Sequence, residues 1–313
     1  MVHNAAIPVD ADATGAVHHD RPLIVVHGNC QAESVRVMMA GTDVATERIP
    51  PAHELTAGDL PALAALLART DVLISQPVRD DYHGLAIGTR QLGAMMPARS
   101  RTVLFPVIRF AGLYPRHLIV RPPGDPSASP PLVAYHDAAL LLTAFDRRSD
   151  ARAPVRRLDL VADQVREIGR RSLHELTRRE ERHGTVRVSD VFERPHFAQM
   201  RTINHPGNPV WRVVAGRIRG LLGLTTEVTE PGRELLDSVH APRSAVVAEA
   251  YGLAVDPTGA IDSVADDSWR VDGRIVDVGE VEEAHLRWYE AHPDAVDAGL
   301  TRHADTLALL GLV

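Results

Sequence analysis

The fold of this chain is decided near its start, by the stretch Arg21-Pro22-Leu23-Ile24-Val25-Val26-His27-Gly28-Asn29-Cys30-Gln31. Its apolar, β-branched first part is typical of a strand that is buried on both faces. Gly28 and Asn29 then break the strand. From Gln31 onward, apolar residues recur at helical spacing until Gly41. The stretch therefore predicts a strand over 21–27, a tight turn, and a helix that ends near Gly41.

The same alternation of strand and helix continues along the chain. Further strands are predicted at 44–49, 71–75 and 102–108, and further helices at 59–69 and 89–96. Strands that alternate with helices of this length form a parallel sheet with helices on both faces. The predicted fold class is therefore α/β, a three-layer Rossmann-like core in which helices flank a parallel β-sheet.

Three segments follow predicted strands directly. They are Cys30, Gln76 and the loop 109–114. Because ligands bind at the carboxyl ends of the strands in such sheets, we expect these segments to share one functional rim.

The regular pattern ends after residue 120. The segment 121–131 contains five prolines, which predicts a loop or lid, and 204–209 is a turn-rich loop. Helices are predicted at 135–145, 158–183 and 210–222, and a hairpin at 269–278 around Asp272-Gly273. The apolar stripe predicted for the second helix comprises Leu158, Val161, Val165, Ile168, Leu173 and Leu176.

We accordingly predict three parts of the chain. They are a flexible tail over 1–20, a catalytic domain over 21–223, and a mainly helical extension over 224–313. The extension is interpreted as either a lid or a docking surface.

Composition excludes several classes of protein. The net charge of −7, with 34 basic and 41 acidic residues, argues against nucleic-acid binding. No apolar run is long enough to span a bilayer, and residues 1–20 do not resemble a secretory signal. A single cysteine forms no internal disulfide, so we expect a cytoplasmic protein. The sequence is compatible with a homo-oligomer.

Cys30 is the strongest candidate for chemistry. It is predicted to stand where a buried strand meets the N-terminus of a helix, whose N–H groups and dipole favour a thiolate and an oxyanion. The alternative, a small buried hydrophobe, is the usual role of an isolated cysteine. The position of Cys30 favours the catalytic interpretation.

A thiol nucleophile needs a base, and His205 is the first candidate. Its loop is fixed by Pro206 and Pro209, and it contains Asn204 and Asn208, which could orient an imidazole. The rival candidates are His136, His83 and His117.

Metal and nucleotide signatures are missing from the sequence. There is no His-Glu-x-x-His, one cysteine cannot build a thiolate zinc site, and no Gly-x-Gly-x-x-Gly or P-loop occurs. We therefore expect no metal and no nucleotide triphosphate hydrolysis.

The turn Gly28-Asn29-Cys30-Gln31-Ala32 resembles the WcbI family of polysaccharide-biosynthesis proteins. Further segments resemble that family in the same order, roughly over residues 22–223. They are Ser75-Gln76-Pro77, Phe105-Pro106, Tyr114-Pro115, Tyr135-His136-Asp137 and Asn204-His205-Pro206.

The resemblance implies an acetyltransferase or other acyltransferase that binds coenzyme A, on a core distantly similar to the SGNH hydrolases. Cys30 would be the nucleophile, with Asn29 and Gln31 in its turn, and His205 would be the base. A sugar hydroxyl, another hydroxyl or an amine would accept the acyl group. The residues expected to bind substrate or coenzyme are Gly28, Gln76, Arg79, Arg109, Tyr114, Arg116, His136 and Asn204, of which Arg79, Arg109 and Arg116 are candidates for the coenzyme phosphates.

Two alternatives stay open at this point. The same thiol with water as acceptor gives a thioesterase or acyl hydrolase. A chain in which Cys30 is structural would be a non-catalytic module that binds a coenzyme or a sugar.

Overall fold

The computed structural model of this protein describes residues 21–224, 227–253 and 268–313. The predicted tail over 1–20 lies outside the described residues. The chain forms two compact units, each built from separate segments. The first contains the described residues of 1–108, 176–190 and 207–236, and the second those of 109–175, 191–206 and 237–313. Both units contain segments from each side of residue 223. The predicted domains 21–223 and 224–313 therefore stay a prediction.

The first unit contains the predicted parallel sheet. Its strands lie in the order β2-β1-β3-β4, and every neighbouring pair is parallel. The α/β fold class is therefore confirmed. The strands are β1 (Leu23–His27), β2 (Ala45–Glu47), β3 (Val72–Ser75) and β4 (Arg101–Leu104).

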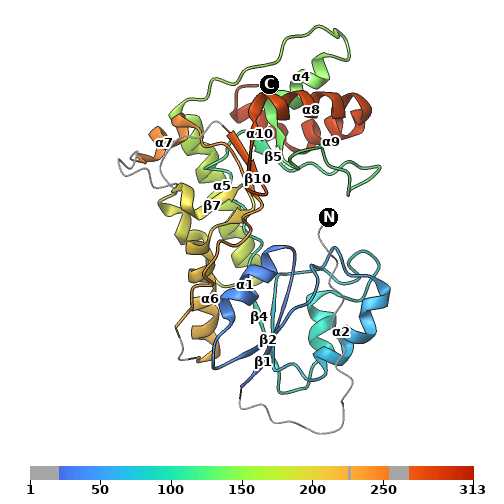
Figure 1. Cartoon of the computed structure of the whole chain (residues 1–313), viewed down its shortest axis with the longest axis vertical. Coiled ribbons are helices and arrows are strands. Elements are labelled where there is room, and N and C mark those ends of the chain that lie inside the picture. Colours follow the sequence, from blue (N-terminus) through green and yellow to red (C-terminus); the bar gives the residue numbers. More distant parts are fainter. Residues whose placement is uncertain (1–20, 225–226, 254–267) are drawn as a thin grey trace. The chain divides into compact units, whose positions relative to one another are not determined.

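Helices cover both faces of this sheet (Figure 1). Leu23 and Val25 of β1 belong to an apolar cluster with α2 (Leu60–Leu67) and α3 (Thr89–Ala94). Because side chains alternate along a strand, Ile24 and Val26 point to the opposite face. There α1 (Gln31–Met39) packs against α6 (Asn208–Leu222). The short η1 (Ala57–Asp59) precedes α2.

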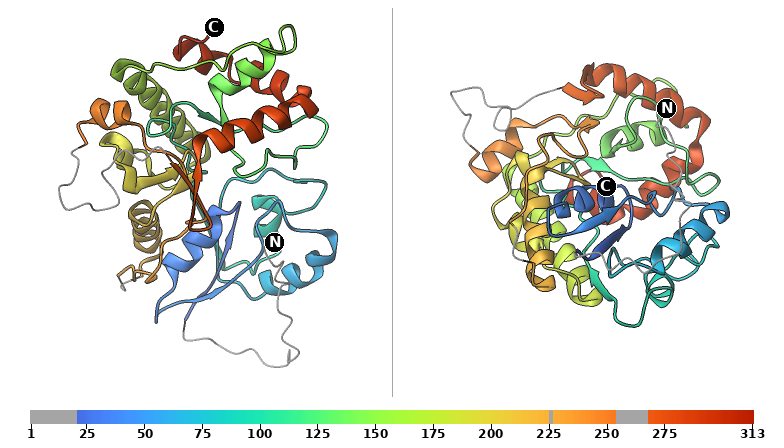
Figure 2. Two further views of the ribbon diagram at one scale, coloured as in Figure 1. Left: turned by 45° about the horizontal axis from the view of Figure 1, so that its top comes forward. Right: turned by 60° about the horizontal axis from the view of Figure 1, so that its bottom comes forward.

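The second unit is mainly helical. Helix α4 (Ala138–Asp146) packs against α8 (Val278–Ala291) and α9 (Pro293–Arg302) (Figure 2). The described residues of this unit also contain α7 (Ala245–Tyr251), α10 (Ala304–Leu309) and the first part of α5 (Ala162–His183). The remaining short helices of the chain are η2 (Ser189–Glu193) and η3 (Phe197–Gln199).

The described residues of the second unit also form three small antiparallel sheets. Strands β10 (Ser268–Val271) and β11 (Arg274–Asp277) form the predicted hairpin. The two residues between them, Asp272 and Gly273, both have positive φ, as a two-residue hairpin turn requires. The other strands are β9 (Val239–His240), which pairs with β10, and the pairs β5 (His117–Leu118) with β6 (His136–Asp137) and β7 (Met200–Thr202) with β8 (His205–Pro206).

Four predicted boundaries are wrong. The helix predicted from Tyr135 begins at Ala138, because 136–137 pair with β5 and the Asp137 carboxylate caps the helix N-terminus. The helix predicted from 158 begins at Ala162, and Val161, with 56% of its surface exposed, is not part of the apolar stripe. The loop predicted over 204–209 contains β8 and the start of α6.

The fourth wrong boundary is the end of the strand predicted over 102–108. Strand β4 ends at Leu104, and the backbone of Ile108 is bonded to a side chain instead of a neighbouring strand. No helix within the described residues is long and apolar enough to cross a membrane.

Candidate active site

The turn after β1 lies where the order of the strands changes direction along the sheet. Strands β2 and β3 lie on opposite sides of β1, which makes the carboxyl ends of β1 and β3 a topological switch point. Ligands bind at such points in open α/β sheets. Residues 28–30 follow β1 and Gln76 follows β3, so the structure brings these predicted site residues together. The third predicted segment, 109–114, belongs to the second unit.

Amide side chains connect the residues at this switch point. The Asn29 N–H donates to Gln76 Oε1 (2.8 Å), and Gln76 Nε2 donates to Gln31 Oε1 (3.0 Å). Gln31 Nε2 donates to the carbonyl of Ile108 (2.8 Å), whose N–H returns a bond to Gln31 Oε1 (3.0 Å). Gln31 and Gln76 are buried. These contacts fix the backbone on both sides of Cys30.

Gly28 is required here by the close approach of Gln76. A Cβ atom on Gly28 would lie 2.6 Å from Gln76 Oε1. A side chain at this position would therefore displace the amide that binds the Asn29 N–H.

Cys30 occupies the N-cap position of α1 and is half-buried. Asn29 Oδ1 accepts a bond from the Gln31 N–H (2.9 Å), which shapes the first turn. Glu33, the acidic residue of that turn, is paired with Arg36 at 2.7 Å, so its charge opposes a thiolate less. The positive end of the helix dipole is directed at this position, as the nucleophile hypothesis requires.

His27 is a buried polar residue next to this turn. Its ring is fully buried, and the backbone of Ile87 is a polar neighbour that favours the charged ring. Burial lowers the pKa of His27 to about 4, so the imidazole is neutral at pH 7.

The predicted base, His205, lies in the second unit on β8. Its ring packs edge-on against the ring of Tyr135, with the two ring centres 6.0 Å apart. The Tyr135 hydroxyl donates to Asn204 Oδ1 (2.8 Å) and accepts from Thr202 Oγ1 (2.9 Å). Burial, and then the charge of Arg201, lower the pKa of His205 to about 4, so its ring is neutral at pH 7 and is a weaker base than a solvated imidazole.

Asn208, which was expected to help orient His205, lies in a different unit from that histidine. It belongs to the first unit, where Asn208 Oδ1 accepts from the Leu235 N–H (3.0 Å) and Nδ2 donates to the Arg233 carbonyl (2.9 Å).

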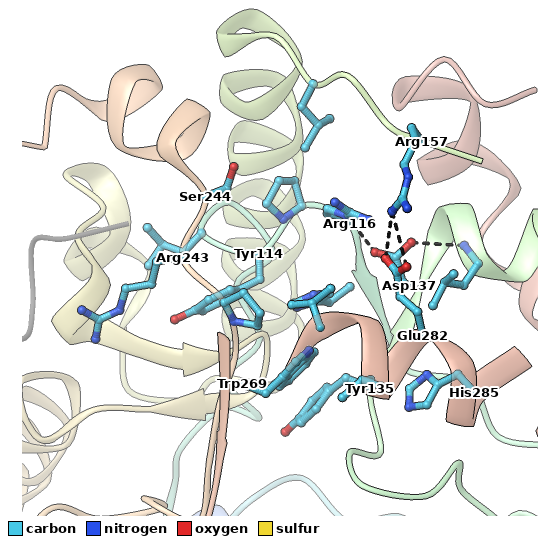
Figure 3. A pocket seen from close by; sticks show the side chains of 18 residues that line it. Tyr114, Arg116, Tyr135, Asp137, Arg157, Arg243, Ser244, Trp269, Glu282 and His285 are labelled. Carbon is cyan, nitrogen blue, oxygen red and sulfur yellow. Dashed lines mark hydrogen bonds and ion pairs between the residues drawn. The ribbon is translucent and has the colours of Figure 1, made fainter. Parts of the chain in front are cut away.

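A pocket of about 270 Å³ lies within the second unit (Figure 3). Two of its lining residues, Tyr114 and Arg116, were predicted from the sequence. Arg116 Nε donates to Asp137 Oδ2 (2.7 Å), and the Tyr114 hydroxyl donates to the Met200 carbonyl (2.8 Å). Its other charged, aromatic and histidine lining residues are Tyr135, Asp137, Arg157, Arg243, Trp269, Glu282, His117 and His285.

Three other predicted binding residues are not among those that line this pocket. His136 is fully buried, its Nδ1 lies 2.7 Å from the Tyr289 hydroxyl, and burial lowers its pKa to about 3. This is the packing of a core histidine. Arg79 lies in the first unit over the ring of Tyr82, and Arg109 is exposed.

Four pocket residues had no signal in the sequence. They are Arg157, Trp269, Glu282 and His285, and Arg157 is more than a hundred residues from the other three in the sequence. Only the hairpin prediction indicated that Trp269 lies in a structured segment. No pattern in one sequence relates the four residues to each other.

A sequence profile described as "Polysaccharide biosynthesis enzyme WcbI" matches residues 23–227, which is more than half of the chain. The chain belongs to the WcbI family. No curated protein matches it. Members of this family are described as polysaccharide-biosynthesis enzymes, so the chain is an enzyme of that kind.

A solved structure of WcbI shares the fold. It is 19% identical to this chain, with a TM-score of 0.73, and the match covers 93% of this chain and 97% of the other. The structural likeness therefore extends past residue 227, where the sequence profile stops. That structure is described as native protein without a disulfide bond between coenzyme A and one of its cysteines. No cluster of metal-ligating side chains occurs within residues 21–224, 227–253 and 268–313.

Proposed function

We propose that this enzyme is an acyltransferase, with acetyl as the expected acyl group. A coenzyme A thioester is the donor, Cys30 is the nucleophile, and a hydroxyl or amine of a sugar or related metabolite is the acceptor. The observation that carries the proposal is the position of Cys30 at the N-terminus of α1, at the switch point of the sheet.

The proposed donor is supported by the related structure. Its description names a disulfide bond between coenzyme A and a cysteine of that protein, as a bond that this particular structure lacks. A disulfide needs two sulfur atoms about 2 Å apart, and the coenzyme sulfur is the atom that carries the acyl group in a thioester. Cys30 is the only cysteine of this chain, and it lies within the part that the family profile matches.

The proposed reaction has two transfers. The Cys30 thiolate attacks the thioester carbonyl, the tetrahedral intermediate collapses, and coenzyme A leaves as its thiolate, which takes up a proton. The acceptor hydroxyl then loses its proton to a base and attacks the acyl-cysteine, which regenerates Cys30. The N-terminus of α1 would stabilise the negative charge on both intermediates.

Gln31 and Gln76 are positioning residues in this scheme. Their side-chain amides are hydrogen-bonded to each other and to the backbone of Ile108 and Asn29. Asn29 acts in the same way through Oδ1. His205 stays the proposed base, because its Nδ1 has no hydrogen-bond partner among the described residues. Its lowered pKa requires that substrate binding or the Cys30 thiolate raise its basicity in the complex.

The experiment that tests the proposal follows acetyl-coenzyme A in the presence and absence of a polyol acceptor. We expect wild type to bind the donor saturably by calorimetry and to release coenzyme A faster when the acceptor is added. Cys30→Ala should bind the donor but release none. No binding of the donor would overturn the proposal.

The same experiment separates the alternatives. Rapid release of free acid without acceptor would identify a hydrolase. Binding without any turnover, together with slow alkylation of Cys30 at neutral pH, would identify a binding module, because a buried structural thiol reacts slowly.

A further inference from the structure

We propose that the pocket of the second unit binds one uncharged, hydroxyl-rich ring, the chemistry that a pyranose sugar presents. The pocket residues lie outside the Cys30 turn, and the inference holds whether or not Cys30 transfers an acyl group.

One wall of the pocket consists of two ion pairs. Arg116 is bonded to Asp137 through Nε (2.7 Å), and Arg157 to Glu282 through Nη1 (3.2 Å) (Figure 3). The other N–H groups of both guanidinium groups make no further hydrogen bond within the described residues. A carboxylate accepts about four hydrogen bonds, so Asp137 and Glu282 also have capacity left. The wall therefore offers donors and acceptors side by side.

This wall carries no net charge. Two guanidinium groups face two carboxylates, and burial lowers the pKa of both His117 and His285 to about 4, so both rings are neutral at pH 7. A phosphate would meet a carboxylate beside each guanidinium. A hydroxyl group instead donates to the carboxylate and accepts from the guanidinium at the same time. The paired charges therefore favour hydroxyl groups over an anion.

The third arginine of the pocket does not change this balance. The guanidinium of Arg243 lies 5.4 Å from the ring centre of Phe197. Figure 3 shows it directed away from the two ion pairs.

His285 adds a buried ring nitrogen to the pocket. Only 1% of its surface is exposed. Its Nε2 lies 3.1 Å from the carbonyl of Val133, and the backbone of Pro131 also acts on the ring. Nδ1 is buried without a hydrogen-bond partner of good geometry among the described residues. Because a hydroxyl group both donates and accepts, a ligand hydroxyl would satisfy this atom in either tautomer.

Aromatic residues also line the pocket. Trp269 and Tyr135 are nearly parallel, with an angle of 16° between their planes, and Trp269 is also stacked on His117, with ring centres 4.9 Å apart. These rings give the pocket an apolar part that the C–H groups of a sugar ring would contact. The volume of about 270 Å³ lies just below the range of small-molecule sites, which span about 300–1,000 Å³. It accommodates one ring.

The test is ligand-observed NMR on the full chain. The probes are the methyl α- and β-pyranosides of glucose, mannose and galactose, with inorganic phosphate as an anionic competitor. We expect at least one glycoside to bind saturably, and phosphate not to displace it. Glu282→Gln should weaken this binding roughly tenfold, or about 1.4 kcal/mol. Its neighbour on α8 gives the matched control, Glu283→Gln, which should leave binding unchanged because Glu283 does not line the pocket.

Three outcomes would overturn the inference: no glycoside binds, Glu282→Gln and Arg157→Ala bind as wild type, or phosphate competes for the pocket. Cys30→Ala should bind the glycoside as wild type does. Loss of acyl transfer with intact glycoside binding would therefore count against the proposed function alone, and the reverse result against the pocket alone.

Discussion

At the turn that carries Cys30, the side-chain amide of Gln31 forms the hydrogen bonds that a neighbouring strand would form in a sheet. It exchanges two hydrogen bonds with the backbone of Ile108, as a peptide group of an adjacent strand would. A third bond comes from Gln76. Because this bonding uses a side chain, the polypeptide after β4 is released from the sheet while its backbone groups stay satisfied.

Replacing Gln31 with Ala should destabilise the protein by about 2–4 kcal/mol, because the buried groups of Ile108 and Gln76 lose their partners. Urea denaturation measures this change. The control is Gln91→Ala: Gln91 bonds to the exposed groups of Asp81 and accepts from the Gly88 N–H at the start of α3, so we expect a smaller loss, about 1 kcal/mol. Equal effects of the two substitutions would contradict the role given to Gln31.

A second prediction concerns Gly28. The Cβ atom of Gly28→Ala would meet Gln76 Oε1 and displace it from the Asn29 N–H. We expect the rate of Cys30 acylation to fall at least tenfold, or about 1.4 kcal/mol of activation free energy. In the double variant Gly28→Ala/Gln76→Ala, the new methyl group should fit, but the hydrogen bond from the Asn29 N–H to Gln76 should stay lost. Gly220→Ala, where nothing lies within 4 Å, should acylate as wild type.

Residues close together in the sequence could be predicted, and residues brought together by folding could not. Gly28, Asn29, Cys30 and Gln31 follow one strand, and Gln76 follows a second. The rule on strand ends is therefore enough to group them. Ile108 takes part through its backbone, and Glu282 reaches Arg157 from a distant helix. Neither contact has a local pattern.

Among the elements of the second unit, two glycines make room for the side chain of Tyr251 on helix α7. Gly169 lies on helix α5, and Gly112 lies in the loop after Ile108. A Cβ atom on Gly169 would lie 2.1 Å from the Tyr251 hydroxyl, and one on Gly112 would lie 2.7 Å from it. The hydroxyl also donates to the Val165 carbonyl (3.3 Å). Only a residue without a side chain leaves room for this contact.

Gly169→Ala should therefore destabilise the protein by about 1–3 kcal/mol through overpacking, although alanine is the better helix former. Thermal unfolding measures the loss. Tyr251→Phe removes the clashing oxygen, and Gly169→Ala/Tyr251→Phe should recover most of the lost stability. A double variant no more stable than Gly169→Ala would contradict this account.

Elements with a strong local pattern were predicted with small errors. Strands β1 and β3 are continuous apolar runs, and the hairpin contains Asp272-Gly273. The start of α4 was misplaced because residues 136–137 pair with β5, nearly twenty residues earlier. That pairing depends on folding rather than on local preference.

At the scale of the whole molecule, buried histidines make stability dependent on pH. Burial is the main cause that lowers the pKa of His27, His117, His205 and His285 to about 4, and that of His136 to about 3. In the unfolded chain histidine titrates near 6.5. As the pH falls from 6.5 to 4, the unfolded chain takes up protons that the folded chain does not, so the folded state loses stability.

We therefore expect the free energy of unfolding to be constant above about pH 7 and to fall steeply on acidification, by about 2 kcal/mol for a single such histidine at pH 5. Urea denaturation across this range measures it. His174→Asn, at an exposed site, should leave the slope unchanged. A free energy of unfolding that is the same at about pH 7 and pH 5 would contradict the burial of these rings.

The organisation into two alternating units had no signal in the sequence. Each unit is assembled from three separate segments, and no change of composition marks their limits. The sequence predicted instead an extension after residue 223. The likeness to WcbI over 93% of the chain places most of that region within the shared fold.

In the proposed reaction Cys30 carries the acyl group. Mass spectrometry of the protein quenched within the first turnover with acetyl-coenzyme A detects such an adduct directly. We expect one acetyl group on the peptide that contains Cys30, and none in Cys30→Ala. Acyl transfer by Cys30→Ala at the wild-type rate, or turnover of wild type without any acetyl adduct, would contradict this proposed role of Cys30.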